Sequence, residues 1–353
     1  MTIDRAMNGR DRKLRVGVVG CGAVVTLHHL PALKRCERVE LVALVDRDRS
    51  WAAKVARKFG ALECYDDHRA MLGRVDAVLV ATPNTTHAEI ACPLLEAGIH
   101  VLCEKPMATT SADVERMFQA SAQGGGRLMA AHNLRFYANI ATIKRLVSAG
   151  ALGVVKEISG GMGGSYHTME HRTDFRKERR LSGGGVLIDL GIHLIDLAVW
   201  LAGESAVSVG YDAVSAPGWN VETDADVALE FPNRSYANLS VSCTHALDNT
   251  LTVRGTHGWA SASLYAAGHL TLFSERARVC QRAGAQQFVL DDTPSYERQI
   301  EHFTDAVLSN RDFVVRDDEV RTDLEIIEHC YGTRSREEVL TPWQSRSENV
   351  GAP

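Results

Sequence analysis

The fold is decided by the stretch Leu14–Val25, which reads LRVGVVGCGAVV. Its apolar beginning suits a buried strand, and Gly20 and Gly22 then match the first two glycines of the GxGxxG fingerprint of dinucleotide-binding domains. Gly20 permits a tight turn, and Gly22 lets the backbone approach a pyrophosphate at the positive end of the following helix. Val25 departs from the fingerprint, because a glycine or alanine usually allows close helix packing there. The alternative interpretation is an ordinary glycine turn of an α/β domain.

A carboxylate at the end of the second predicted strand supports dinucleotide binding. Asp46 follows the run Leu41–Val45, 24 residues after Gly22, where it can accept hydrogen bonds from the ribose hydroxyls of adenosine and repel a 2′-phosphate. A solvated loop carboxylate is the alternative for this residue. Arg47 could instead pair with the 2′-phosphate, so we expect NAD, with NADP as the alternative. The cofactor contacts expected here are Gly20, Cys21, Gly22, Ala23, Val24, Asp46 and Arg47.

Short apolar runs alternate with helical patterns in the first part of the chain, as in a parallel sheet built from βαβ units. Most of these runs are unbroken, which suits strands that are covered on both faces. The pattern predicts an α/β fold with an N-terminal doubly wound parallel sheet of the Rossmann type. The expected strands are Leu14–Val19, Glu40–Val45, Ala61–Tyr65, Ala77–Ala81, His100–Cys103 and Arg127–Ala131.

Polar residues follow the later strands of this predicted sheet. Ligands of open parallel sheets bind outside the carboxyl ends of the strands, where the strand order reverses. We therefore expect these polar clusters to meet in one crevice, together with the glycine turn. The cofactor-binding candidates among them are Thr82, Pro83, Asn84, His87, Glu104, Lys105 and Asn133.

The second half of the chain contains successive strand-like segments, which predict an antiparallel sheet with a few helices. We expect residues 1–135 to form the cofactor-binding domain and residues 136–353 to form a second α/β domain with an open, predominantly antiparallel sheet. An exposed face of such a sheet is usually covered by a partner, which predicts a homodimer or homotetramer. The expected strands are Val207–Val214, Asp226–Phe231, Tyr236–Ser242, Leu251–Arg254, Ala260–Leu264 and Leu270–Phe273, and the expected helices are Ile140–Ala149, Val186–Leu201, Tyr296–Ser309 and Asp318–Tyr331.

Composition excludes several classes of function. The chain has 353 residues, and 39 basic against 44 acidic side chains give a formal net charge of -5, so nucleic acid is not an expected partner. No window approaches the roughly 18 uninterrupted apolar residues of a membrane span, and the N-terminus lacks the apolar core of a signal peptide. We expect a cytoplasmic protein without membrane contact. Eight cysteines without a CxxC pair favour reduced core thiols over disulfides or zinc, so no structural metal is expected.

One helix carries a polar stripe on an otherwise apolar surface. At about 100° per residue, Asp189, His193 and Asp196 fall on one face of the predicted helix Val186–Leu201. Such a helix should be buried, and buried polar groups require partners. A self-satisfied Asp–His pair in the core is the alternative to a catalytic role. The preceding run Gly183–Gly185 favours catalysis, because glycines let a backbone pass close to a ligand, which would expose the start of the helix to substrate.

Three motifs together resemble the Gfo/Idh/MocA oxidoreductase family, which includes glucose–fructose oxidoreductase and inositol dehydrogenase. They are the turn Gly20-Cys21-Gly22, the tripeptide Glu104-Lys105-Pro106 and the glycine-led helix with Asp189, His193 and Asp196. The similarity extends over nearly the whole chain, including Thr82-Pro83-Asn84 with His87 and the helices near the C-terminus. It implies the two-domain fold described above, and a cis peptide before Pro106 that directs the lysine.

The resemblance also implies the roles of the site residues. Lys105 would contact nicotinamide and substrate, and Asp189 and His193 would bind substrate and handle its proton. A histidine titrates near neutrality, so His193 is the preferred acid and base, with Lys105 as the alternative proton donor. Glu104 either orients Lys105 or ends a strand in solvent. The expected substrate contacts are Lys105, Tyr166, Arg176, Asp189 and His193.

These expectations describe an NAD(P)-dependent dehydrogenase or ketoreductase that acts on a sugar, cyclitol or aminoglycoside-like substrate. Two other functions stay open. One is an NAD-dependent glycosidase that oxidises its substrate transiently, eliminates the glycosidic substituent and returns the hydride. The other is a non-catalytic regulator that senses a sugar or NAD, which the intact Lys105, Asp189 and His193 disfavour. A basic run from Arg172 to Arg180 could reach an anionic sugar, although a solvated loop is the simpler interpretation.

Overall fold

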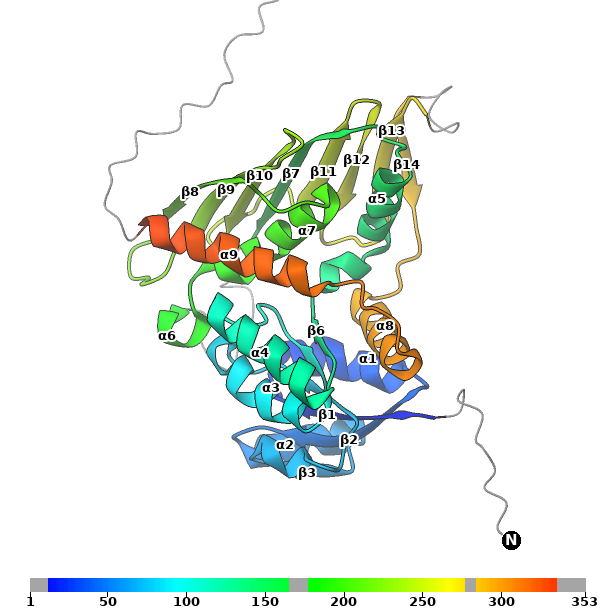
Figure 1. The fold of residues 1–353 in the computed structure, drawn as a ribbon, viewed down its shortest axis with the longest axis vertical. Helices are drawn as coiled ribbons and strands as arrows, with labels where there is room; N and C mark the ends of the chain where they lie inside the picture. The colour runs from blue at the N-terminus through cyan, green and yellow to red at the C-terminus, as the bar shows by residue number, and fades with distance from the viewer. Residues whose placement is uncertain (1–11, 165–176, 277–283, 335–353) are drawn as a thin grey trace, which may run out of the picture.

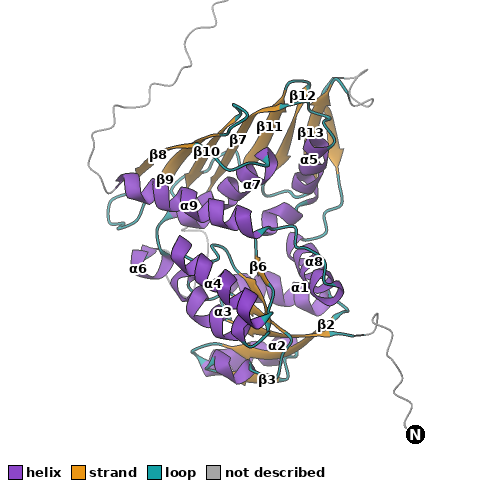
Figure 2. Cartoon of the chain, viewed as in Figure 1, coloured by secondary structure: helices purple, strands orange, loops and turns teal. Residues whose placement is uncertain are grey.

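The computed structural model describes residues 12–164, 177–276 and 284–334. This part of the chain forms two β-sheets, one from each half of the sequence, with helices α8 and α9 lying near the junction between them (Figure 1). Helices flank the first sheet on both faces and cover one face of the second (Figure 2).

The first sheet is a parallel Rossmann-type sheet of six strands in the order β3-β2-β1-β4-β5-β6. The order reverses between β1 and β4, which marks the switch point where ligands of such sheets bind. All four residues of β4 are buried, as its unbroken apolar run predicts. All six strands expected from the sequence are confirmed: β1 Leu14–Val19, β2 Val39–Val45, β3 Glu63–Tyr65, β4 Ala77–Val80, β5 His100–Cys103 and β6 Leu128–Ala130.

The helices of the first half pack against this sheet and begin and end at residues suited to those positions. The side chain of Thr110 accepts a hydrogen bond from the backbone of Asp113 at the start of α4. The short helical turns occupy the carboxyl ends of several strands. The elements are η1 Val25–His29, α1 Leu30–Arg35, α2 Arg49–Phe59, η2 His68–Met71, η3 Asn84–Thr86, α3 His87–Glu96, α4 Ser111–Gly124, η4 Asn133–Phe136 and α5 Ala138–Ser148.

The second sheet has eight strands in the order β14-β13-β12-β11-β7-β10-β9-β8, and only the pair β7 and β10 is parallel among its described strands. A predominantly antiparallel sheet is therefore confirmed. The strands are β7 Val155–Gly163, β8 Ser208–Val214, β9 Asp224–Glu230, β10 Tyr236–Ser242, β11 Thr250–Gly255, β12 Gly258–Ser263, β13 His269–Ser274 and β14 Gln286–Val289.

The central strand β7 is absent from the sequence-based expectations. Its sequence VKEISGGMG contains three glycines, which weaken the pattern of a strand. The structure gives a reason for Gly160, because a Cβ atom there would lie 3.0 Å from Leu251 and 3.2 Å from Leu194 of α7. The absence of a side chain at this position lets the buried helix pack closely on the middle of the sheet.

The helices of the second half fill the space between the second sheet and the first domain. All residues of α7 from Ile192 to Leu201 are buried, as the predicted helix requires. The segment Arg179–Ala202 is long and apolar enough to cross a membrane, but 83% of its most apolar window is buried inside the fold, so it reads as a core helix. The helices are α6 Arg179–Ser182, η7 Leu187–Gly191, α7 Ile192–Ala202, α8 Ser295–Ser309 and α9 Asp317–Arg334.

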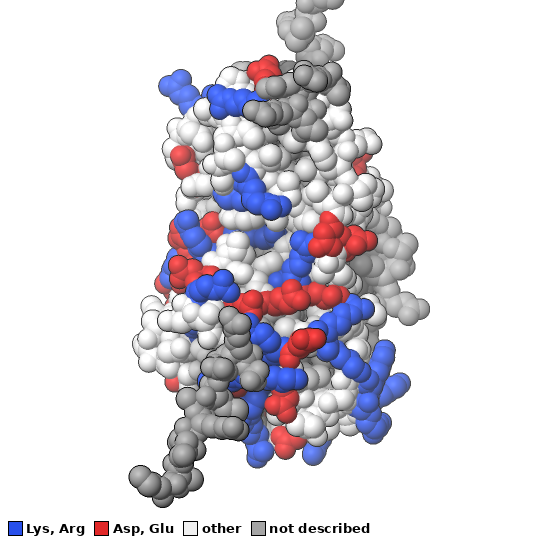
Figure 3. All heavy atoms as spheres, turned by 90° about the vertical axis from the view of Figure 1, so that its right-hand side faces the viewer, with Lys and Arg blue, Asp and Glu red and all other residues white. Residues whose placement is uncertain are grey.

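The C-terminal helices tie the two halves together through polar contacts. Helix α9 packs on α4, where Glu328 accepts hydrogen bonds from the backbone and the hydroxyl of Ser111. Helix α8 packs on α1, and Arg35 pairs with Glu297 there. On the face of the molecule that carries α8, basic and acidic side chains are interspersed (Figure 3). This mixture agrees with the nearly balanced composition of the chain.

Candidate active site

The glycine turn at the end of β1 has the geometry that a bound dinucleotide requires. Gly20 has a φ of +94°, and a Cβ atom there would lie 2.3 Å from the carbonyl oxygen of Ala81, so only glycine fits. Around Gly22, in contrast, no atom lies within 4 Å of the position of a Cβ atom. Half-buried Ala23 and Val24 follow it. Open space therefore borders the backbone where a pyrophosphate is expected, and the residues present fit this group.

The third position of the fingerprint is adapted to its valine. Val25 is fully buried and begins η1, a π-helical turn that precedes α1. A π-helical turn is wider than an α-helical one, and such turns occur frequently at functional sites. The wider first turn provides room for a side chain where the fingerprint usually has a glycine or alanine.

Asp46 lies beside the glycine turn and stabilises it. Its Oδ2 accepts a hydrogen bond of 2.9 Å from the backbone N–H of Cys21, and its Oδ1 accepts one of 3.0 Å from Asp48. The indole of Trp51 donates to the carbonyl oxygen of Cys21 at 2.8 Å, so the turn is held from two sides. Arg47 is exposed. Trp51 lies in the first turn of α2 and was not among the residues expected from the sequence.

Glu104 is buried and connects the first helix to the strand that carries Lys105. Its Oε1 lies 2.6 Å from Nε2 of His29, and its Oε2 accepts a hydrogen bond of 3.0 Å from the backbone of Lys105. Burial raises the pKa of the Glu104 carboxyl, but the His29 contact and the Lys105 charge outweigh it, and the net pKa lies below the usual value. Glu104 thus orients the lysine loop and does not end a strand in solvent. His29 was missed, although a histidine on the buried face of the first helix is a usable signal.

Lys105 reaches across from the first domain to the glycine-led helix. Its ammonium donates to Oδ1 of Asp189 at 2.8 Å and to the carbonyl oxygen of the same residue at 2.7 Å. The side chains of both residues are about 15% exposed, so the pair borders solvent while most of it is enclosed. The peptide before Pro106 is cis, as the family resemblance implies. The structure therefore brings together two of the three predicted catalytic residues in direct contact.

His193 lies in the first turn of α7, close to this pair. The residue is 7% exposed, and its Nδ1 is buried without a hydrogen-bond partner in the described part of the chain. Burial lowers its pKa well below the usual value of 6.5, the charges of Lys105 and His132 lower it further, and Asp189 opposes them. The imidazole is neutral at pH 7 and can accept a proton.

The glycine run before this helix packs tightly against other residues of the protein. This corrects the expectation that the run exposes the start of the helix to substrate. A Cβ atom at Gly185 would lie 2.1 Å from the backbone oxygen of Glu222, and one at Gly184 would lie 1.9 Å from the hydroxyl of Tyr331. Oε1 of the buried Glu222 accepts hydrogen bonds from the backbone of Gly185 and Leu187. The start of the helix is thus capped by a carboxylate of the protein.

The remaining predicted cofactor residues hold the loops that follow the strands. The two ring nitrogens of His87 lie 2.9 Å from the carbonyl oxygens of Thr82 and Pro106, so this fully buried histidine joins two loops and has no nitrogen left for a cofactor. The amide of Asn84 donates to the carbonyl oxygen of Ser182, beside the glycine run. Thr82 shares a hydrogen bond with Thr86, Pro83 immediately precedes η3, and Asn133 donates to Ser295. The predicted substrate residues Tyr166 and Arg176 lie outside the described residues.

Comparison with known proteins decides the family. The model described as "Oxidoreductase family, NAD-binding Rossmann fold" matches residues 14–132, and that of the GFO/IDH/MocA C-terminal domain matches residues 140–261. This chain belongs to the Gfo/Idh/MocA oxidoreductase family. The resemblance seen in the sequence motifs is thereby confirmed, as is the Rossmann fold. A nicotinamide dinucleotide is the cofactor, and this Gfo/Idh/MocA protein is an NAD(P)-dependent dehydrogenase or reductase.

Its relatives include sugar oxidoreductases. D-glucoside 3-dehydrogenase of Escherichia coli (strain K12) is 34% identical over 203 residues, which span 55% of this chain and 55% of that protein. Levoglucosan dehydrogenase of Pseudarthrobacter phenanthrenivorans is 32% identical, over 70% of this chain and 73% of the relative. The crystal structure of aldose-aldose oxidoreductase from Caulobacter crescentus, complexed with glycerol, superposes with a TM-score of 0.82 at 28% identity, covering 92% of this chain and 98% of that one.

Proposed function

We propose that this Gfo/Idh/MocA protein transfers a hydride between NAD and a secondary alcohol or ketone of a sugar, cyclitol or aminoglycoside-like substrate. The observation that carries the proposal is the contact of Lys105 with Asp189 beside a neutral, buried His193 at the carboxyl ends of the parallel strands. The sugar-specific names of its relatives support the substrate class. We further propose residues 1–135 as the cofactor unit and residues 136–353 as the substrate unit.

The three residues suit the oxidation of an alcohol. When bound, the nicotinamide ring supplies the hydride acceptor for oxidation or the donor for reduction. The charge of Lys105 lowers the pKa of the substrate hydroxyl and stabilises developing oxyanion character. Nε2 of His193 takes the hydroxyl proton as the carbonyl forms, and in the reverse direction returns it. Asp189 holds the lysine ammonium in place and offers an acceptor for a neighbouring hydroxyl.

We propose NAD over NADP, because Asp46 lies at the glycine turn whereas Arg47 is exposed. A cytoplasmic location agrees with the cysteines of the described residues, which are all free. We also propose a homodimer or homotetramer. The side of the second sheet opposite α5 and α7 carries no helix in the described part of the chain, and a second copy could cover it (Figure 1).

A substrate panel tests the function directly. Sugars, inositols and aminoglycosides are offered with NAD and NADP, and the absorbance of the reduced nicotinamide is followed. Steady accumulation of the reduced cofactor with at least one member supports a dehydrogenase. Release of a glycosidic substituent without accumulation would identify the glycosidase, and binding without turnover for every member would identify a sensor.

A further inference from the structure

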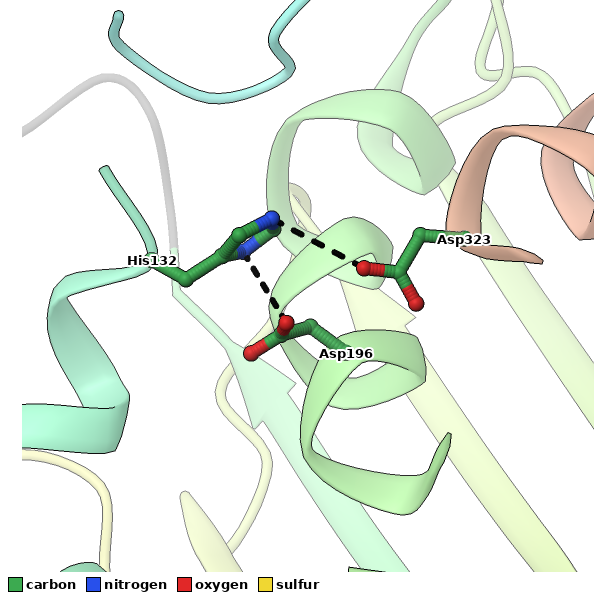
Figure 4. A group of neighbouring side chains, drawn as sticks. All are labelled: His132, Asp196 and Asp323. Carbon is green, nitrogen blue, oxygen red and sulfur yellow. Dashed lines mark ion pairs between the residues drawn. The ribbon is translucent and has the colours of Figure 1, made fainter. Parts of the chain in front are cut away.

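A second cluster of titratable side chains lies near the site and takes no part in the mechanism above. It joins His132, which follows β6, Asp196 of α7 and Asp323 of α9 (Figure 4). All three side chains are at most 1% exposed. Nδ1 of His132 lies 3.5 Å from Asp196 and Nε2 lies 3.7 Å from Asp323, so the ring sits between the two carboxyl groups at distances beyond those of good hydrogen bonds.

The cations around this cluster contact groups other than Asp323. The guanidinium of Arg135 binds Asp196 through Nε at 3.0 Å and Nη2 at 2.6 Å, and its Nη1 binds Glu319 at 2.5 Å. The ammonium of Lys144, on α5, donates to the carbonyl oxygen of Trp200. Burial lowers the pKa of His132, so its ring adds no lasting positive charge. Three carboxyl groups therefore share one guanidinium in the interior of the protein.

Such a site cannot hold three ionised carboxyl groups. Removing an unpaired carboxylate from water costs far more than keeping its proton, and two adjacent carboxylates resolve the conflict by sharing one proton. Asp196 and Glu319 contact the guanidinium directly, whereas neither oxygen of Asp323 accepts a hydrogen bond from any of the described residues. Burial and the charge of Asp196 raise the pKa of Asp323 well above its usual value, with Arg135 opposing, which supports the same assignment.

We propose that Asp323 carries a proton in the folded protein and shares it with Asp196, so that α9 is joined to α7 and to the end of β6 behind the active site. Asp196 lies three residues after His193, about one helical turn along α7. Contacts that hold Asp196 in place therefore also hold the rotation of α7 about its axis, and this rotation sets the direction of the His193 side chain. Asp323 is therefore a positioning residue for His193. This positioning role rests on the proposed function, whereas the protonation of Asp323 does not depend on it.

A metal ion is the competing occupant, since a histidine and two aspartates can serve as ligands. Two observations disfavour it. The two ring nitrogens of His132 face different carboxyl groups, as the dashed lines in Figure 4 show, so one ion cannot use both directions. Asp196 is also bound in a bidentate manner to Arg135, whose positive charge would repel an ion placed beside it.

The pair of variants Asp323→Asn and Asp196→Asn tests the proposal in the full-length protein. An asparagine at position 323 has the shape of the protonated acid and donates an N–H to Asp196, so turnover should stay within about twofold and the urea midpoint at pH 7 should be equal or higher. An asparagine at position 196 removes the carboxylate that binds Arg135 in a bidentate manner and should lower kcat by about tenfold to a hundredfold through misplacement of His193. The KM for NAD should change less than kcat.

A direct readout needs no substrate. The infrared spectrum of the wild-type protein in deuterated buffer should contain a protonated-carboxyl band that is missing in Asp323→Asn, and elemental analysis of the wild type should find no stoichiometric metal. The proposal is overturned if the band is absent, if Asp323→Asn loses as much stability as Asp196→Asn, or if a bound metal disappears with either variant. An inactive wild type would refute the proposed function and leave these three readouts intact.

Discussion

At the scale of single residues, His193 and Lys105 should fail in different ways when they are replaced. His193→Ala removes the proton acceptor and should lower turnover about a hundredfold or more. The pKa of His193 lies well below 6.5. The wild-type rate of alcohol oxidation should therefore fall only at a pH well below 6.5, where the ring becomes protonated. The variant should lose this acidic limb. The measurement is kcat for alcohol oxidation against pH.

Lys105→Ala is the matched comparison. It removes the positive charge and should cut turnover by about a hundredfold or more, but it should retain the acidic limb, and NAD affinity should change little. If His193→Ala keeps near-normal turnover with an unchanged pH profile, His193 is not the proton acceptor, and that role belongs to Lys105.

Asp46 should select the cofactor by its charge and stabilise the glycine turn by its hydrogen bonds. Asp46→Ala loses both functions, whereas Asp46→Asn keeps an oxygen that can accept from the backbone of Cys21. Both variants should narrow the preference for NAD over NADP, and the alanine variant should also weaken NAD itself. Titration of the dissociation constants for both cofactors checks this. Equal affinities in the unmodified protein would show that Asp46 is not the selector.

At the scale of elements, the glycines of β7 should matter on one face of the sheet. Gly160→Val adds a side chain toward Leu251 and Leu194, where even a Cβ atom is crowded, and should destabilise the protein by about 1–3 kcal/mol. Gly161→Val, on the opposite face, meets only ordinary contact at 3.6 Å from Leu247 and is the control. Urea unfolding measures both. Similar losses for the two variants would show that helix packing is not the constraint.

The sequence predicts elements well where their burial is simple. Strands β4 and β6 of the first sheet are apolar runs whose residues are all buried, and Tyr236–Ser242 is predicted at its observed bounds. Elements whose form depends on contacts between residues far apart in the sequence are not predicted. The glycines of β7 are explained only by α7, the widened turns η1 and η7 arise within segments that read as plain helix, and the cap from Glu222 lies 37 residues from Gly185.

The polar stripe of the glycine-led helix shows the same limit at the site. Asp189, His193 and Asp196 do turn toward the first domain, but their partners could not be assigned by spacing. Asp189 contacts Lys105 after β5, and Asp196 contacts Arg135 after β6. Which carboxylate serves the site and which serves the core depends on where those strands end.

At the scale of the whole molecule, the open second sheet bears on assembly. Its strands alternate buried and outward-facing residues, and Tyr236 is 43% exposed on the uncovered side. We expect a dimer or tetramer by sedimentation velocity at micromolar concentration, because a second copy would remove this face from solvent. Tyr236→Glu should weaken the assembly, while Leu62→Glu, at an exposed residue of the first domain, is the control. A monomer at that concentration would contradict the proposed assembly.

Stability of the whole fold should fall as the solution is acidified from pH 7 to pH 5. Burial lowers the pKa values of His87, His132 and His193, so between pH 6.5 and their folded pKa values these rings bind protons only in the unfolded chain. Each such ring reduces the free energy of unfolding by up to about 1.4 kcal/mol per pH unit.

Asp323 acts in the opposite direction, because its raised pKa makes the folded state hold an extra proton above about pH 4. Three histidines outweigh one carboxyl, so the urea midpoint should drop on acidification, and more steeply in Asp323→Asn, where the opposing proton is gone. A midpoint that is constant or rises between pH 7 and pH 5 would mean that these histidines are charged in the folded protein, which would also remove the neutral His193 on which the proposed proton transfer depends.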